Sequence, residues 1–342
     1  MSSVMEIKAD SEYKLRVAEQ GGTPTAATSA FEEELAFPGR LNAFLMVLVI
    51  GATLCLYVFI NPRIEPYSFV PYVLIISTCV LLKYYVMRRT SFGEIFRQRM
   101  QLLLNGVVFI FVALASLRIF NHLTMSLALP LADPLLDSWD KALGLDWMTY
   151  FTFVQNHSLV STILEVAYVG FDGASLFGFV VLVAMGYFRR ARYFCEIFLI
   201  TAAISTTIAL FFPAVAAVVY NFGPIDQIEG FNSAPGIYHL EQFMALREAE
   251  IPSIDLMTAT GLATFPSFHA AGGVLLIAGF FRTRLSIAVT AFALVMIASV
   301  PVFGGHFLID AIVGILLAAT VSVLNARRSC YAGLFGKDPN RY

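Results

Sequence analysis

The sequence carries a series of long apolar runs after residue 40, and each is long enough, or nearly so, to cross a lipid bilayer as a helix. At a rise of 1.5 Å per residue, about 20 residues cover the roughly 30 Å of hydrocarbon in a membrane. The run Phe268–Phe281 is short, and it reaches a full span only if its helix continues to Arg284. The pattern predicts an all-α polytopic membrane bundle of about eight transmembrane helices. The runs are Leu41–Ile60, Tyr67–Met87, Leu102–Leu123, Leu159–Phe188, Phe194–Tyr220, Phe268–Phe281, Leu285–Phe303 and His306–Ala326.

Few charges are available to cover a soluble surface. Charged residues make up 13% of the 342 residues, about half the usual share, and hydrophobic residues make up 58%. This composition indicates lipid as the solvent and argues against a disordered or fibrous protein. The net charge of −2 leaves no basic excess for a polyanion, so no nucleic-acid partner is expected. The spacing of the four cysteines predicts neither a disulfide framework nor a zinc site.

The runs divide the chain into four parts. Residues 1–36 are predicted to be a flexible cytoplasmic tail, 37–100 two N-terminal transmembrane helices, 101–326 a six-helix membrane domain and 327–342 a second cytoplasmic tail. The connections on one side carry thirteen Lys and Arg residues, and the alternate connections carry three. The positive-inside rule then places both termini in the cytoplasm. It also turns the long connections 121–158 and 221–267 toward the extracytoplasmic side.

Two polar segments open the sixth and eighth runs at the same predicted depth, on the extracytoplasmic side. The first contains Ser267 and His269, and the second contains His306 and Asp310. His306 and Asp310 are four residues apart, which places them on one helical face, where the carboxylate can accept a hydrogen bond from one imidazole nitrogen. The other imidazole nitrogen is then fixed as the basic, nucleophilic one.

The surroundings of these residues suit an anion. Ser267 follows a proline and is a candidate N-cap, and Gly304-Gly305 is expected to leave the first amides of the eighth run uncovered. Two helix N-termini could thus point N–H groups at one ligand. A phosphate held there would meet His306 as nucleophile and His269 as acid for the leaving oxygen, while Asp310 orients His306.

Three other interpretations stay open at this point. The histidines can be interfacial residues with an intrahelical hydrogen bond, which is the usual case for a single histidine at a helix end. Two His and one Asp can form a metal-binding facial triad, although no further acid with ligand spacing accompanies them, so no metal or other cofactor is expected. A non-enzymatic transporter of anionic lipid would use the same side chains as a proton relay.

The segments Pro266-Ser267-Phe268-His269 and His306-x-x-x-Asp310 resemble the second and third signatures of the type 2 phosphatidic acid phosphatase superfamily. They are most similar to its inositol phosphorylceramide synthase-like branch, and the segment Asp137–Trp147 also resembles a loop of that branch. The resemblance covers roughly residues 100–326. It implies a six-helix catalytic core with two added N-terminal spans, metal-independent chemistry and a phosphohistidine intermediate.

The resemblance also assigns roles and substrates. By position, His306 is the nucleophile, Asp310 its partner and His269 the acid and base. Ser267, Gly304 and Gly305 are then substrate-binding residues around the phosphate. The implied substrates are phospholipid or sphingolipid-type molecules in the bilayer, and protein partners are left open.

Two departures from the superfamily bear on the substrate. Its first signature, Lys-x-x-x-x-x-x-Arg-Pro, should fall near the outer end of the fifth run, yet Phe211–Ala217 has neither base. In the third signature a Ser-Arg pair should precede the histidine, yet Ser299 is followed by Val300. A phosphate monoester dianion would lack neutralising cations in a low-dielectric site, whereas a phosphodiester carries one charge fewer. The sequence therefore favours transfer or cleavage at a phosphodiester lipid head group over a monoester phosphatase.

Other polar residues within the runs are weaker candidates. Arg118 is a candidate phosphate contact, although snorkelling to the interface is the more common behaviour of such a residue. Tyr168 and Asp172, with Glu165 on the same face of the fourth run, are candidate contacts to a polyol head group.

Four more charged or titratable residues are expected to have no role in chemistry. Two histidines are predicted to be exposed in loops, His157 and His239. Two charges near the inner ends of the runs are predicted to snorkel, Lys83 and Glu196.

Overall fold

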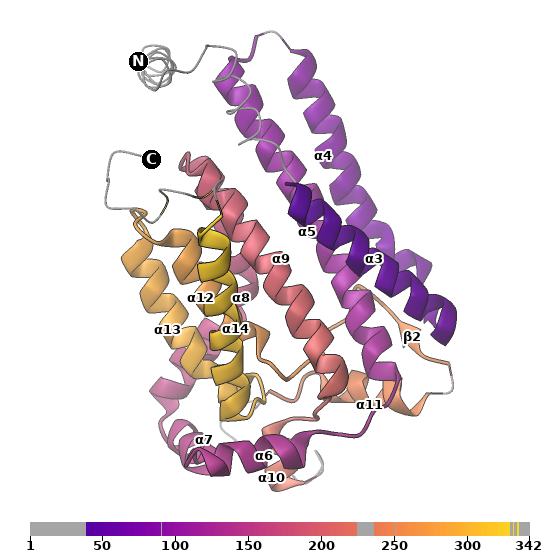
Figure 1. Cartoon of the computed structure of the whole chain (residues 1–342), viewed down its shortest axis with the longest axis vertical. Coiled ribbons are helices and arrows are strands. Elements are labelled where there is room, and N and C mark those ends of the chain that lie inside the picture. Colours follow the sequence, from indigo (N-terminus) through magenta and orange to yellow (C-terminus); the bar gives the residue numbers. More distant parts are fainter. Residues whose placement is uncertain are drawn as a thin grey trace.

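The computed structural model of the chain describes residues 39–89, 91–223, 236–249, 251–328, 331 and 334. The predicted tail over residues 1–36 lies outside them. Within the described residues the chain is almost wholly helical (Figure 1), and its sheet is one parallel pair, β1 (Arg63–Ile64) and β2 (Ser253–Ile254). The predicted all-α class is confirmed.

Seven helices of the described chain are long and apolar enough to cross a membrane. The 3-10 helix η1 (Pro66–Phe69) leads into the second of them. An eighth apolar helix, α12 (Phe268–Phe280), has 13 residues and ends before Arg284, so it is shorter than a full span. The seven are α3 (Arg40–Ile60), α4 (Val70–Arg88), α5 (Glu94–Ser126), α8 (Ser158–Ala184), α9 (Phe188–Phe211), α13 (Ser286–Phe303) and α14 (Leu308–Ala326).

The predicted run Phe194–Tyr220 is not one helix. α9 begins earlier than the run, at Phe188, and ends at Phe211. Pro213 follows and has no amide hydrogen to donate, and the chain then runs irregularly into the short helix α10 (Ala217–Phe222). The prediction of a helix to Tyr220 is wrong. Residues 214–218 are apolar because four of them are buried inside the protein next to the polar segments, and not because they belong to a helix that faces lipid.

Helix α12 lies in the middle of the bundle and packs against α8, α9, α13 and α14. Glycines permit this close packing. A Cβ at Gly272 of α12 would overlap the ring of Phe171 on α8, and a Cβ at Gly314 of α14 would overlap the backbone oxygen of Ser267. The contact between the beginnings of α12 and α14 therefore depends on a glycine.

Helices α3, α4 and α5 stand beside this bundle as a group (Figure 1). Both α3 and α4 pack on α5. Only 11% of the most apolar stretch of α3 and of α4 is buried inside the protein, against 50% for α9. The two N-terminal helices therefore present most of their surface to the surrounding lipid. Between α4 and α5, Lys83 donates a hydrogen bond to Asn105, with 2.8 Å from Nζ to Oδ1.

Short helices cover the end of the bundle at which α12 and α14 begin (Figure 1). They are α6 (Asp133–Ala142), α7 (Trp147–Asn156), α10 and α11 (Leu240–Glu248). α6 and α7 belong to the long connection 121–158, and α11 belongs to the connection 221–267. Apolar residues of α6 and α7, including Leu136 and Trp147, form a core with Phe303 at the end of α13 and Phe307 just before α14. The connections are therefore a packed layer over the polar segments.

The opposite end of the bundle contains a buried acid. Glu196 of α9 is fully buried and pairs with Arg192 at 3.3 Å and with Arg328 at 2.6 Å. The prediction that Glu196 snorkels is wrong, because these arginines neutralise its charge inside the protein. Tyr331 and Leu334 are also buried at this end, packed with the core around α9.

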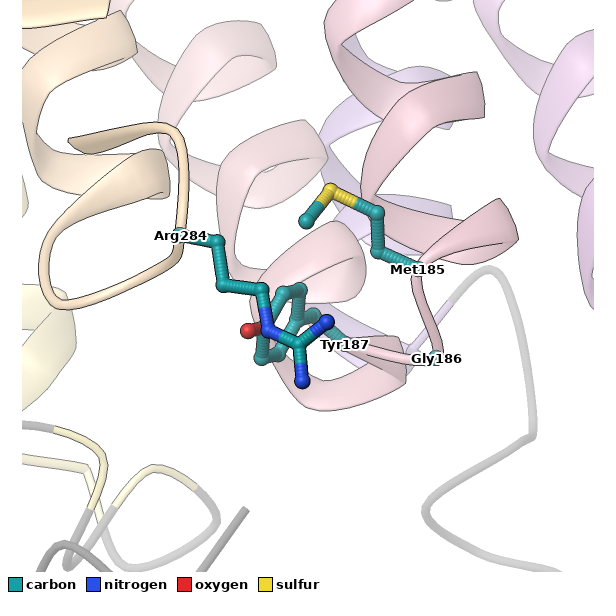
Figure 2. Close-up of a pocket in the computed structure, with 4 residues that line it drawn as sticks. All are labelled: Met185, Gly186, Tyr187 and Arg284. Carbon is teal, nitrogen blue, oxygen red and sulfur yellow. The ribbon is translucent and has the colours of Figure 1, made fainter. Parts of the chain in front are cut away.

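A cavity of about 270 Å³ opens at the same end, between the α8–α9 turn and the α12–α13 turn (Figure 2). It lies at the far end of α12 from His269, so it is separate from the polar segments. Its lining consists of Met185, Gly186, Tyr187 and Arg284.

Candidate functional site

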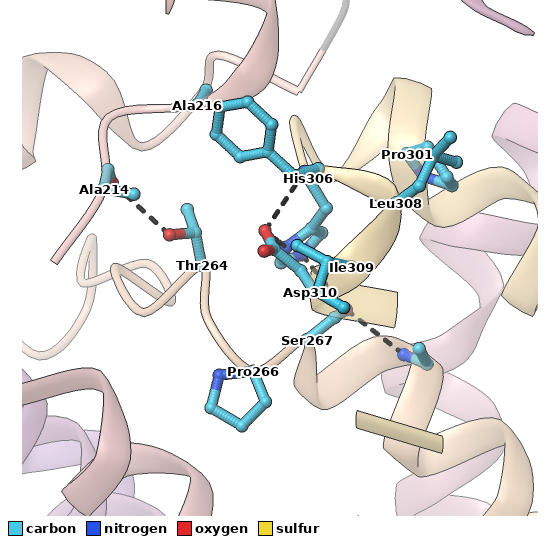
Figure 3. A network of polar contacts seen from close by, with 12 residues as sticks. Ala214, Ala216, Thr264, Pro266, Ser267, Pro301, His306, Leu308, Ile309 and Asp310 are labelled. Atoms are coloured by element: carbon cyan, nitrogen blue, oxygen red, sulfur yellow. Dashed lines mark hydrogen bonds and ion pairs between the residues drawn. The ribbon is translucent and has the colours of Figure 1, made fainter. Parts of the chain in front are cut away.

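Three side chains form a hydrogen-bonded row where α12 and α14 begin (Figure 3). Asp310 Oδ2 lies 3.2 Å from His306 Nδ1, and His306 Nε2 lies 3.2 Å from Ser267 Oγ. All three are buried, and His306 is 4% exposed. The backbones are joined as well, because the Ser267 amide donates to the Asp310 carbonyl at 3.0 Å. The predicted pairing of His306 with Asp310, and the meeting of the two segments, are present.

Local sequence explains how this row is held. Ser267 is the N-cap of α12, as predicted, and its hydroxyl accepts a hydrogen bond from the Ala270 amide at 3.3 Å. Asp310 is the third residue of α14, and its Oδ2 accepts from the Phe307 amide at 3.1 Å. Each polar residue is therefore fixed by the helix start that it caps. A Cβ at position 304 would overlap the His306 ring, so this position requires a glycine.

His269 lies in the first turn of α12, beside the row. Its ring stacks on Tyr168 of α8 with 4.3 Å between centroids and 12° between planes, and it also contacts the ring of Phe171 at 4.7 Å. His269 and His306 are close enough for their charges to interact. In the described part of the chain neither ring nitrogen of His269 is hydrogen-bonded, so both are available to a ligand.

The beginning of α14 does not offer free amides. The carboxylate of Asp140 on α6 accepts hydrogen bonds from the backbone amides of Leu308 at 2.9 Å and Ile309 at 2.7 Å. The prediction that Gly304-Gly305 leaves these amides uncovered is wrong, because a carboxylate from a distant part of the chain caps them. The α12 start differs: within the described residues the amides of Phe268 and His269 have no acceptor. Of these two helix starts, only that of α12 therefore has amides free to receive an anion.

Two other segments of the chain, at Ala217 and Gly236, cover the turn Gly304-Gly305. Gly305 adopts a φ of 67°, and its carbonyl accepts the Ala217 amide at 2.8 Å. The Gly236 amide donates to the Val302 carbonyl at 2.9 Å, and a Cβ at Gly236 would overlap the backbone of this turn. The glycines therefore shape the turn and admit a covering segment, rather than exposing amides.

Helices α6 and α7 brace the turn that carries His306. The Trp147 indole donates to the carbonyl oxygens of Pro301 at 3.2 Å and His306 at 3.0 Å. Asp133 accepts the Val215 amide at 3.1 Å, on the segment that runs past the row. Burial raises the pKa of Asp133 and of Asp140, because the charged carboxylate loses its water.

Sequence reasoning missed these bracing residues. Asp133, Leu136 and Asp140 are all buried and follow a spacing of three and four residues. This spacing places them on one face of α6. If residues 133–142 had been predicted as a helix, Asp133 and Asp140 would have been placed on its apolar, buried face. Buried Asp residues are uncommon and therefore indicate a specific role.

His239 is not the exposed loop residue that was predicted. It is 2% exposed, and its Nε2 donates to the Val215 carbonyl at 2.9 Å. Burial lowers the pKa of His239 to about 4, and the nearby charge of His306 acts in the same direction. No periodic pattern surrounds His239, so its burial follows only from the folding of the connection over the row. His157 is exposed, as predicted.

The weaker candidates fall into two groups. Tyr168 lies at the site, and its hydroxyl is 3.0 Å from that of Tyr238, which precedes α11. Asp172, one turn further along α8, is exposed and close enough to both phenols for their charges to interact. Arg118 is half-buried on α5, and the structure joins its side chain to none of these residues. Its backbone oxygen is 2.8 Å from His122 Nδ1.

The positions where the resemblance would place cations contain none. Residues 213–217 run beside the row, where Thr264 donates to the Ala214 carbonyl at 3.4 Å (Figure 3). Ser299 is buried and donates to the Met296 carbonyl of its own helix. Among the described residues, no Lys or Arg forms a hydrogen bond or ion pair with the row or with His269. The same residues include no group of three or more His, Cys, Asp or Glu that could hold a metal ion.

Comparisons with known proteins add one finding. A family model described as the PAP2 superfamily matches residues 135–324, which is more than half of the chain. The matched residues include the row, His269, Asp140 and Trp147. No curated protein and no solved structure matches the chain.

Proposed function

The chain belongs to the PAP2 superfamily, and from this premise we propose that it is a membrane lipid phosphotransferase or phosphatase that acts on a phosphodiester through His306. The family supports a phosphatase-type enzyme, and the apolar helices support a multi-pass membrane protein. The observation that carries the finer proposal is the Asp310–His306–Ser267 row. In this row, Nε2 of His306 lies beside the hydroxyl of Ser267, the N-cap of α12.

The proposed reaction has two steps. His306 Nε2 attacks phosphorus, the N–P bond forms, and the bond from phosphorus to the leaving oxygen breaks. His269 gives its proton to that oxygen. In the second step a lipid alcohol or water attacks the phosphohistidine, the N–P bond breaks, and the incoming hydroxyl returns a proton to His269.

The other residues act on these atoms without changing covalently. Asp310 holds the proton on Nδ1 of His306 and stabilises the positive charge of the phosphorylated ring. Ser267 and the first amides of α12 donate hydrogen bonds to the phosphate oxygens. Ser267 must therefore turn its hydroxyl from His306 Nε2 toward the phosphate when the lipid binds.

A diester fits this site better than a monoester. A monoester dianion next to the buried Asp310 would need cations, and no Lys or Arg of the described chain reaches the row. A diester carries one negative charge, for which two amides and two imidazoles are a suitable set of partners. Transfer of a head group to a lipid alcohol, as in inositol phosphorylceramide synthase-like proteins, is the form of this reaction that we favour.

We also propose that the row faces the extracytoplasmic side, with both chain termini in the cytoplasm. The thirteen-to-three distribution of Lys and Arg supports this orientation.

The test is to trap the intermediate. Purified protein is mixed with a diester lipid labelled at phosphorus, quenched in denaturant after a short interval, and digested for mass spectrometry. We expect label on the peptide that contains His306, no label in His306→Ala, and normal labelling in the control His157→Ala. Label that persists in His306→Ala, or labelling by phosphatidic acid in preference to every diester, would contradict the proposal.

A further inference from the structure

A group of two tyrosines and an aspartate includes a ring that lies against His269. Tyr168 stacks on the His269 ring, and its hydroxyl is 3.0 Å from the hydroxyl of Tyr238. Asp172 is one helical turn from Tyr168, and its carboxylate interacts electrostatically with both phenols. We call Tyr168, Tyr238 and Asp172 the tyrosine–aspartate group.

Asp172 is in an unusual position for a charged residue. It lies near the middle of α8, one of the seven helices long enough to span the membrane, and its side chain is exposed. In the described part of the chain it forms no ion pair and no hydrogen bond. An unpaired carboxylate at membrane depth is costly, and such residues mark ligand sites by default.

Charge balance selects the ligand. A phosphodiester bound at His306 brings one negative charge, and Asp172 adds another. The two imidazoles and the α12 amides are the partners of the phosphodiester charge, so a neutral polyol head group would leave the charge of Asp172 uncompensated. An ammonium group would neutralise Asp172, and the zwitterionic head group as a whole would add no net charge to the site.

The aromatic residues suit the same ligand. Tyr238 is 51% exposed, and the face of an aromatic ring attracts positive charge. The phenol oxygens can accept hydrogen bonds from a primary ammonium. One face of Tyr168 is already covered by His269, so Tyr238 and Asp172 supply most of the contact.

From this geometry we infer that the tyrosine–aspartate group is a head-group subsite for the ammonium of an amino-alcohol phosphodiester lipid. The inference rests on the proposed function and deepens it by naming the substrate class. It also revises the polyol head group that the sequence suggested for Asp172. Two carbon atoms separate nitrogen from oxygen in such a head group, so its ammonium stays close to the phosphate and within reach of a subsite beside the two histidines.

The kinetic test compares donors that differ only in the head group. Wild type and Asp172→Asn are assayed with phosphatidylethanolamine and phosphatidylcholine, and with phosphatidylglycerol and phosphatidylinositol, in the same mixed micelles. We expect Asp172→Asn to raise KM about tenfold for the two amine donors while KM for the polyol donors stays within about twofold. Asp137→Asn removes a carboxylate that pairs with the exposed Lys141 on α6, away from this group, and is the control that should change neither class.

Three results would overturn the subsite. An equal loss on all four donors would mean that Asp172 supports the fold, and no loss on any donor would mean that it contacts no head group. A selective loss on the polyol donors would make the group a polyol site.

A binding measurement separates this inference from the proposed function. In detergent, His306→Ala protein is heated with glycerophosphoethanolamine or with glycerophosphoglycerol, two water-soluble diesters. The subsite is supported if glycerophosphoethanolamine alone raises the Tm of His306→Ala and this rise is absent in the His306→Ala, Asp172→Asn double variant. This result would stand even if no donor is turned over. Absence of any difference between the two diesters would overturn it even if phosphotransfer is found.

Discussion

Ser267 presents its hydroxyl to the nitrogen of His306 that is proposed to attack phosphorus. An Asp–His–Ser row of this kind is also the arrangement that activates a serine nucleophile in other enzymes. The two roles predict different activities for a protein that lacks the hydroxyl. If Ser267 only binds phosphate, His306 keeps its partner Asp310 and remains able to react.

We therefore predict that Ser267→Ala lowers kcat by on the order of 10², because one hydrogen bond to the phosphate in the transition state is lost. The lost N-cap of α12 should also lower stability by about 1 kcal/mol. Initial rates on a diester lipid measure the first effect and thermal unfolding in detergent the second. Ser267→Thr keeps the hydroxyl and should recover most of the activity. A loss in Ser267→Ala as complete as that in His306→Ala would instead make Ser267 the nucleophile.

At the same scale, the sequence predicted the partners that are close along the chain and missed those that are not. His306 with Asp310, and Ser267 with the α12 amides, follow from helical spacing and N-cap preference. His239 was placed wrongly because burial of a lone histidine depends on how a long connection folds. Asp140 was missed because its partners are 168 and 169 residues away along the chain.

Among the elements, α6 is the one that fixes the start of α14. The Asp140 carboxylate of α6 accepts hydrogen bonds from two backbone amides of α14. It also places a negative charge at the positive end of the α14 helix dipole. Because His306 lies just before α14, a shift of this helix would move the reacting nitrogen. Misplacement by about 1 Å is enough to cost activity on the order of 10².

We predict that Asp140→Asn destabilises the protein by about 1 to 3 kcal/mol, because the amide leaves one buried N–H of α14 without an acceptor. It should also lower kcat more than it raises KM, because the lipid contacts are unchanged. Tm and initial rates in detergent are the measurements. Asp137→Asn is the control, since Asp137 is on the same helix but pairs only with the exposed Lys141. Equal effects of the two substitutions would show that α6 does not position His306 through Asp140.

The ends of helices could be predicted where an apolar run gives way to polar residues. They could not be predicted where the chain stays apolar beyond the end of the helix. The ends of α3 and α14 fall within a residue or two of the apolar runs. By contrast, α9 ends inside an apolar run, since residues that line a buried site are as apolar as residues that face lipid. Hydropathy alone does not separate these two surroundings, and Pro213 was the local signal.

Across the whole molecule, the two ends of the bundle differ in charge. One end holds Glu196 with its arginines, and the other holds Asp133 and Asp140 of α6 and Asp310 of α14. The excess of basic residues at the first end is what orients such a protein in a membrane. The proposed orientation can therefore be tested without any substrate.

We predict that a cysteine at Ser138 on α6 reacts with a membrane-impermeant maleimide added to intact cells. A cysteine at Arg284, in the α12–α13 turn, should react only after the cells are permeabilised. Both positions are accessible, and the native cysteines are replaced by alanine in the background protein. Reaction of Arg284→Cys but not Ser138→Cys in intact cells would reverse the orientation.

The layer of short helices has a consequence for the fate of the reaction intermediate. His306 is 4% exposed, and Gly236 closes the turn beside it, so bulk water has little access to a phosphoryl group on that ring in this state. Exclusion of water protects reactive intermediates from hydrolysis. The lifetime of the proposed phosphohistidine is then set by how often the cover opens, and a lipid alcohol that enters from the bilayer competes with few water molecules for it.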